Sequence, residues 1–134
     1  MIFKDKNVND SLVKIAALLI HAAKIDEIYS DKEEQIIRKA IVELGADKDA
    51  INIIIENATK LEENSNQIID FTREIKSLED QEKIKILETL WRIIYSNNEA
   101  DIFETNLMRR LTGLLYIDSN LMGHIKEKIK KENK

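Results

Sequence analysis

The chain contains no proline and only three glycines in 134 residues, and this shortage limits the folds that are open to it. Tight hairpin turns depend on glycine and proline, so an all-β fold is disfavoured. Hydrophobic residues make up 43% of the chain and charged residues 34%, a mixture typical of a globular helical protein. Since this length fits one domain with one core, we expect an all-α, single-domain compact bundle of about seven helices.

Apolar residues recur at steps of three and four along most of the chain, the spacing of one helix face. The first such run, from Leu12 to about Ile25, predicts a helix capped by Asp10 or Ser11. Later helices are expected to begin at Ser30, Asp47, Ile68, Ser77, Asp101 and Asp118 or Ser119. The expected divisions are a polar lead-in (1–13), a helical domain (14–131) and a polar tail (132–134).

Two local patterns predict how the second helix begins and ends. Ser30 and Glu33 form a capping box, in which each side chain accepts a hydrogen bond from the other residue's backbone N–H group. Gly45 follows the last apolar residue, Leu44, and predicts a left-handed C-cap.

Charge and composition disfavour several classes of partner. Lys and Arg number 21 against 25 Asp and Glu, a net charge of −4, whereas a nucleic-acid protein needs a basic surface. The most apolar stretch, residues 15–23, falls well short of the roughly 20 residues of a membrane span. With no cysteine and no apolar signal core, the expected location is cytoplasmic.

The chain contains two helical hairpins in the same register. A shift of 71 positions places Ser30 on Asp101, Glu33 on Glu104 and Asp26 on Asn97 with no gap. Each unit has an Asp or Asn at the end of one helix and a Glu seven residues later. The pattern predicts paired sites, one in each unit.

The paired acids have two interpretations. Carboxylates at one helix N-terminus suit a hard divalent cation, with loop carbonyls and waters completing its shell. Alternatively, Glu33 and Glu104 are capping residues, and Asp26 and Asn97 hold the loops. An EF-hand is excluded, because Ile28 stands where that loop needs a ligand.

Three stretches resemble one known family: AAKIDEIYSDKEEQIIRKA at 22–40, FTREI at 71–75 and LWRIIYSNNEADIFETNLMRRLTGLLYI at 90–117. Together they resemble the TerB-like (tellurite resistance protein B) family over about residues 14–130. Members carry two Asp-Gly stretches, each followed by a helix-starting Glu, with a Leu-Trp pair before the second. The resemblance implies a compact helical bundle without established enzymatic activity, a link to tellurite or chemical-stress responses, and divalent-metal binding.

The resemblance also assigns metal-site residues. Position by position, the family's acids fall on Asp26, Glu33, Asn97 and Glu104. Both family glycines are replaced, by Glu27 and Asn98, and Asn97 removes one negative charge. We therefore expect any calcium, magnesium or zinc ion to be weakly held.

Other candidate residues are expected to be structural. His21 lies among apolar residues with no ligand three or four positions away, so a partly buried, hydrogen-bonded histidine is expected; His124 is expected at the surface. Trp91 has the spacing of a core residue. Arg109 and Arg110 are expected to pair with loop acids rather than to bind an anion.

We expect a non-catalytic binding module whose acidic two-loop face engages a divalent cation or a partner protein. No nucleophile with a nearby base and no phosphate-binding glycine loop is recognisable. The alternative is a structural interaction or homodimerisation domain with an apolar groove near Trp91. A cation-dependent hydrolase is a third, less supported class.

Overall fold

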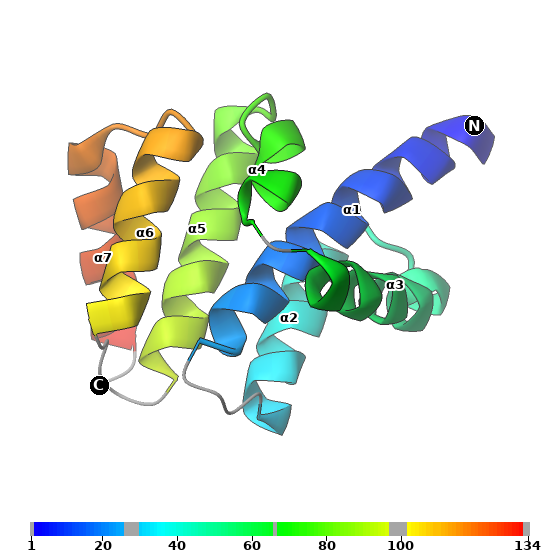
Figure 1. Ribbon diagram of the computed structural model, residues 1–134, viewed down its shortest axis with the longest axis horizontal. Helices are drawn as coiled ribbons and strands as arrows, with labels where there is room; N and C mark the ends of the chain where they lie inside the picture. Colours follow the sequence, from blue (N-terminus) through cyan, green and yellow to red (C-terminus); the bar gives the residue numbers. More distant parts are fainter. Residues whose placement is uncertain (1, 26–29, 66, 97–101, 133–134) are drawn as a thin grey trace.

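The structure is a computed structural model that describes residues 2–25, 30–65, 67–96 and 102–132. For residues 2–9, 74 and 102–104 it describes the backbone alone. Its seven α-helices and one short 3₁₀ helix are α1 (Ile2–Ala23), α2 (Asp31–Glu43), η1 (Lys48–Ala50), α3 (Ile51–Asn64), α4 (Ile69–Ile75), α5 (Asp80–Tyr95), α6 (Ile102–Leu114) and α7 (Ser119–Glu132). No strand occurs among these residues. The expected all-α bundle of about seven helices is confirmed (Figure 1).

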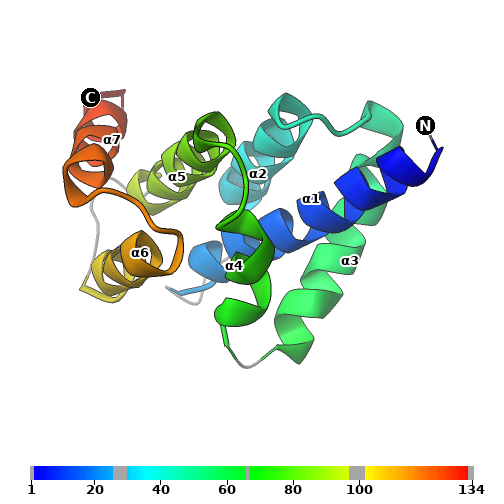
Figure 2. The same ribbon diagram turned by 90° about the horizontal axis from the view of Figure 1, so that it is seen from above.

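Helix α1 runs through the middle of the molecule. Five consecutive residues, Ala16 to Ile20, are each 0% exposed. A helix that is apolar on all sides needs neighbours on all sides, and α2, α3, α4 and α5 all pack against α1. Figure 2 shows α4 lying across the second half of α1, with α3 on one side and α6 on the other.

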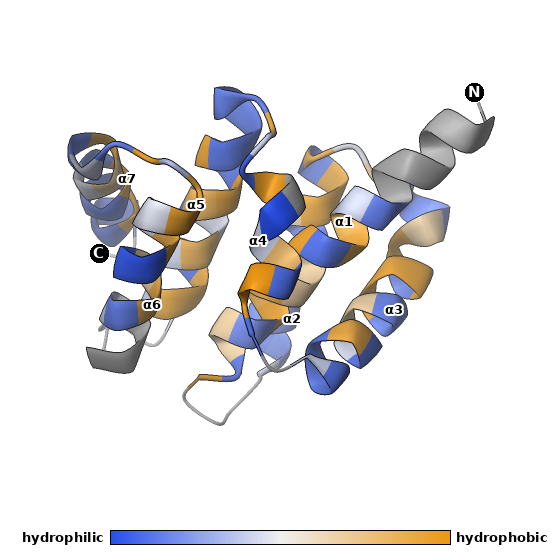
Figure 3. Ribbon diagram, turned by 45° about the horizontal axis from the view of Figure 1, so that its top comes forward, coloured by the Kyte–Doolittle hydropathy of each residue, from blue (hydrophilic) through white to orange (hydrophobic). Residues whose placement is uncertain are grey.

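Helix α5 is the second central element. Its buried residues include Leu87, Leu90, Trp91 and Ile94, as their spacing predicts. The middle turns of α5 are largely apolar, whereas α3 and α7 carry apolar and hydrophilic residues around the same helix (Figure 3). Because α5 packs against α1, α2 and α7, both halves of the chain share one core.

The predicted start of the first helix is wrong. Asp10 and Ser11 lie inside α1, which already begins at Ile2. The residues before Asp10 include neither proline nor glycine. Since a capping residue is only a favourable start and does not stop a helix that can propagate further, α1 continues toward the N-terminus.

The predicted boundaries of α2 are confirmed. Ser30 Oγ accepts a hydrogen bond from the Glu33 N–H at 3.1 Å, and Glu33 Oε1 accepts one from the Ser30 N–H at 2.9 Å. Beyond the helix, the Gly45 N–H donates to the Val42 carbonyl and the Ala46 N–H to the Ile41 carbonyl, both at 3.0 Å. This pair of bonds is a Schellman motif, and Gly45 has the positive φ, +116°, that the motif requires.

Helix α6 ends in the same motif with a tyrosine in the glycine position. The Tyr116 N–H donates to the Gly113 carbonyl at 3.3 Å, and the Ile117 N–H donates to the Thr112 carbonyl at 2.9 Å. Tyr116 has a φ of +58°, a conformation that costs a residue with a side chain roughly 1–2 kcal/mol. Its ring lies 5.7 Å from Lys76 Nζ, an exposed cation–π contact worth about 0.5–1 kcal/mol. The contact therefore does not fully offset the strain.

The cap predicted for α5 is wrong, and the cap predicted for α7 is confirmed. The N-cap of α5 is Glu79, not Ser77, and the Glu82 carboxylate accepts a hydrogen bond from the Glu79 N–H at 3.4 Å. At the start of α7, Asp118 Oδ1 accepts a hydrogen bond from the Asn120 N–H at 2.8 Å.

The internal repeat has a structural counterpart. Ile102 follows Asp31 by 71 positions and Leu114 follows Glu43 by the same 71, so α2 and α6 are both 13 residues long. Gly45 and Tyr116 also differ by 71 positions and occupy the same place in two Schellman motifs. The register predicted from sequence therefore joins equivalent elements.

Candidate metal and interaction site

The two interhelical connections begin and end at one end of the molecule. Figure 1 shows the end of α1, the start of α2, the end of α5 and the start of α6 side by side at the lower edge. A hydrogen bond ties the two units there, because Lys32 Nζ donates to the Ser96 carbonyl at 3.0 Å. We call this end, made by Ile25, Ser30–Glu34, Ser96 and the start of α6, the two-loop face.

Glu33 is the buried acid of the two-loop face. Its side chain is 1% exposed, although it lies in the first turn of α2. Oε1 accepts hydrogen bonds from both the Ser30 N–H, at 2.9 Å, and Ser30 Oγ, at 3.1 Å. A buried carboxylate needs hydrogen bonds or a positive charge to remain ionised. Glu33 therefore serves as a capping residue, and its chemistry also suits a cation.

The structure describes the four predicted metal-site residues to different extents. Asp26 and Asn97 lie outside the described residues. Glu104 lies in the first turn of α6, where the structure describes only its backbone. Only Glu33 is described in full. Within the part of the chain that the structure describes, no three His, Cys, Asp or Glu side chains cluster in a way that could hold a metal ion.

The other acids of the two-loop face are more accessible than Glu33. Asp31 is exposed. Glu34 pairs with Arg38, whose Nε lies 2.9 Å from Glu34 Oε2. Lys32 adds a positive charge between them in the sequence, so the first turn of α2 carries three acids and one lysine. Glu99 and Asp101 lie outside the described residues.

A contact between α1 and α3 was missed by sequence reasoning. Glu62 accepts hydrogen bonds from Lys24 Nζ at 2.8 Å and pairs with His21 Nδ1 at 3.2 Å. Burial raises the pKa of Glu62, but the hydrogen bonds from Lys24 and His21 outweigh it, so its pKa lies below the ordinary 4.5. The expected partly buried, hydrogen-bonded His21 is confirmed. Its partner is 41 residues away, beyond the reach of spacing rules.

Trp91 is a core residue, as its spacing predicts. Its side chain is 2% exposed, its ring stacks on Tyr95 with centroids 5.8 Å apart, and its Nε1 donates to Met122 Sδ at 3.4 Å. Because these contacts and Lys126 cover the ring, Trp91 does not line a surface groove.

The remaining candidates lie at the surface. His124 is exposed, as expected. Arg109 and Arg110 are also exposed. Asp26 and Glu27, the acids of the first loop with which they are expected to pair, lie outside the described residues. No described helix combines the length and the apolar character needed to cross a membrane.

The comparisons with known proteins decide the family. A protein-family model described as tellurite resistance protein TerB matches residues 12–127. The chain belongs to the TerB family. No curated protein and no solved structure matches it. The TerB match covers both helix-loop-helix units, including the whole of the two-loop face.

Proposed function

We propose that this TerB-family chain is a non-catalytic binding module that holds a divalent cation at its two-loop face. The ligands are Asp26, Glu33, Asn97 and Glu104, two from each unit, completed by loop carbonyls and water. In this proposal the bound cation serves a stress response, of which tellurite is one example. The protein supplies the binding site and carries out no reaction of its own.

The observation that carries this proposal is the hydrogen bond between Lys32 and Ser96, which joins the two units at 3.0 Å. It supports one shared site in place of a separate site in each unit, because ligands from two connections must come within a few ångströms to share one ion. The burial of Glu33, at 1% exposed, supports it further, since the first turn of an exposed helix does not otherwise require a buried acid.

The charge of the face sets the expected affinity. Asn97 contributes an amide where a carboxylate would contribute a negative charge, and Lys32 adds a positive charge to the same end. Calcium affinity rises with the number of ligand charges. A weak site is therefore proposed.

The test is a calorimetric titration of chelator-stripped protein with calcium, magnesium and zinc. Saturable binding is expected in the natural chain and should be lost in the double variant Glu33→Gln, Glu104→Gln, because two negative ligand charges are removed. Glutamine retains the capping-box hydrogen bond while removing the charge, so α2 should keep its start.

The matched control is Glu82→Gln. Glu82 has the same capping position at the start of α5, which Figure 1 shows at the end of the molecule opposite the two-loop face. This variant should bind the cation like the natural chain. The proposal would be refuted if none of the three metals gave a heat of binding. It would also be refuted if the Glu33→Gln, Glu104→Gln variant bound as well as the Glu82→Gln control. The acids would then be helix caps in a structural interaction domain.

A further inference from the structure

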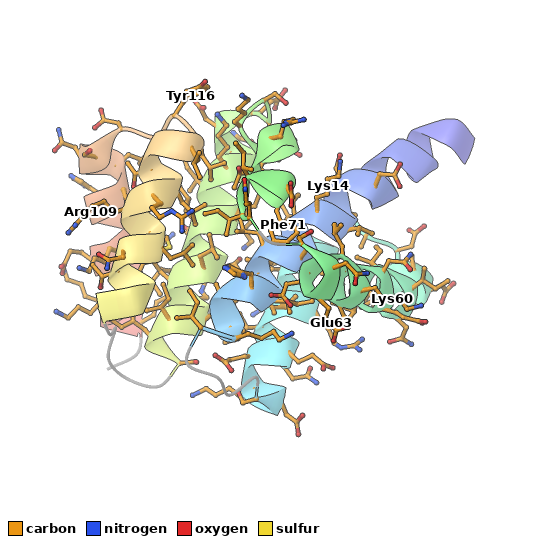
Figure 4. All side chains as sticks on the ribbon, viewed as in Figure 1. Lys14, Lys60, Glu63, Phe71, Arg109 and Tyr116 are labelled. Atoms are coloured by element: carbon orange, nitrogen blue, oxygen red, sulfur yellow. The ribbon has the colours of Figure 1, made fainter. Side chains whose placement is uncertain are left out.

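A groove lies between α4 and α6, away from the two-loop face. Its volume is about 270 Å³, and we call it the α4–α6 groove. It is lined by Ile69, Thr72, Arg73, Lys76, Gly113, Leu114 and Tyr116. Figure 4 labels Tyr116 at the upper edge of the molecule, opposite the connections that form the two-loop face. The groove is therefore separate from the proposed cation site.

The spacing on α4 gives the groove an apolar floor with a basic rim. Thr72 and Arg73 lie three and four residues after Ile69, and Lys76, the residue after α4, lies four and three residues after them. The four residues therefore share one helix face. Ile69 is 41% exposed, although most large apolar residues of the described chain are buried. Leu114 adds a second, half-buried apolar side chain from α6.

Tyr116 is the most unusual residue of the α4–α6 groove. Its side chain is 74% exposed, and its backbone is in the left-handed conformation that Gly45 adopts at the equivalent place in the first unit. The Lys76 contact touches the ring and leaves most of it uncovered. Backbone strain that local contacts do not explain is concentrated at functional positions in proteins.

The charge around the groove is opposite to that of the whole chain. Arg73 and Lys76 line it, and Arg110 lies one turn before Leu114 on the same side of α6. Among the described residues the arginine ion pairs are those of Arg38 and Arg92, and Arg73 takes part in neither. In a chain of net charge −4, this local excess of positive charge complements an acidic partner.

We propose that the α4–α6 groove docks an acidic segment of a partner protein, which inserts one apolar side chain between Ile69, Leu114 and Tyr116. The carboxylates of the segment pair with Arg73 and Lys76. A second copy of this chain is a poorer occupant, because a two-fold interface places the same patch on both sides and would oppose these cations to their own copies.

The test uses fluorescein-labelled peptides in which Glu and Asp residues flank one central Leu, Phe or Trp, with Lys-flanked peptides for comparison. Fluorescence anisotropy should show saturable binding of the acidic peptides to the natural chain. Backbone amide shifts in NMR spectra of the ¹⁵N-labelled protein should then change at the groove residues, and not at Ser30–Glu34.

Two variants separate the contribution of the Tyr116 ring to peptide binding from that of the Arg73 and Lys76 charges. Tyr116→Gly should weaken peptide binding about tenfold or more, while its thermal melt remains that of a folded protein, since glycine favours this backbone conformation. Arg73→Glu with Lys76→Glu should abolish binding. The matched control Lys48→Glu with Lys130→Glu makes the same change in net charge at exposed positions outside the groove and should bind normally.

Several outcomes would overturn the proposal. No saturable binding, equal binding of the Lys-flanked peptides, or equal loss in the control variant would each do so. Binding that does not depend on the central apolar residue would show a simple anion site. A concentration-dependent mass that the Arg73→Glu, Lys76→Glu variant abolishes would identify a second copy as the occupant.

Discussion

Gly45 and Tyr116 occupy equivalent positions in the Schellman motifs at the ends of α2 and α6. The stability that glycine gives to a left-handed backbone can therefore be measured at both positions. We expect Tyr116→Gly to be more stable than Tyr116→Ala by about 1 kcal/mol, because both lose the ring and only alanine retains the left-handed strain. Urea unfolding of the two variants measures this difference, and equal stabilities would contradict it.

The same substitution should have opposite signs at two glycines. Gly45→Ala is expected to destabilise the protein by about 1 kcal/mol, since φ is +116° there. Gly123→Ala lies inside α7 and should stabilise it by about 0.5–1 kcal/mol. No heavy atom lies within 4 Å of an added Cβ at either position, so the backbone alone decides the sign.

The lowered pKa of Glu62 predicts a loss of stability in acid. In the unfolded chain this carboxyl titrates near 4.5, and in the folded protein it titrates lower. Above 4.5 both states are ionised and its contribution is complete. As the pH falls through 4.5 toward the folded pKa, the unfolded state binds the proton first, and the contribution is lost.

Glu62→Gln is therefore expected to lower the free energy of unfolding by about 1–2 kcal/mol at neutral pH, with a difference from the natural chain that shrinks below pH 4.5. Urea unfolding across the acid range measures it. Glu56→Gln is the control, since Glu56 lies on the same helix, is 67% exposed and pairs with the equally exposed Lys60 at 3.5 Å. A constant difference at every pH would refute the assignment.

At the scale of elements, the sequence predicts helices well where apolar spacing and cap chemistry agree. Ser30 with Glu33 marks the start of α2, and Gly45 marks its end. The start of α1 was missed because Asp10 is a favourable cap that does not break a helix. The cap of α5 was missed because Ser77 is the commoner capping residue, and Glu79 replaces it.

The candidate sites were less predictable, because they depend on contacts between distant elements. Glu33 could be found from its capping box, but Lys32 meets Ser96 across 64 positions. The α4–α6 groove exists only when two helices pack together. The conformational preference of a tyrosine argues against a left-handed backbone at Tyr116, although the 71-residue repeat aligns this position with Gly45.

At the scale of the whole molecule, the two units are one cooperative structure. Helices α1 and α5 are in contact, and one continuous core contains buried residues of both units. We expect a single unfolding transition. Trp91 fluorescence, which reports on the second unit, should have the same thermal midpoint as far-ultraviolet circular dichroism, which reports on all helices. Separate midpoints would show that the repeated units unfold independently.

Helix α6 is a fixed spacer between the two proposed sites. It begins at the two-loop face and ends beside Tyr116, and its 13 residues span about 20 Å at 1.5 Å per residue. A partner held in the α4–α6 groove would thus be kept about that far from an ion at the other end. Both could be held at once, and the chain would then join them as an adaptor, with neither excluding the other.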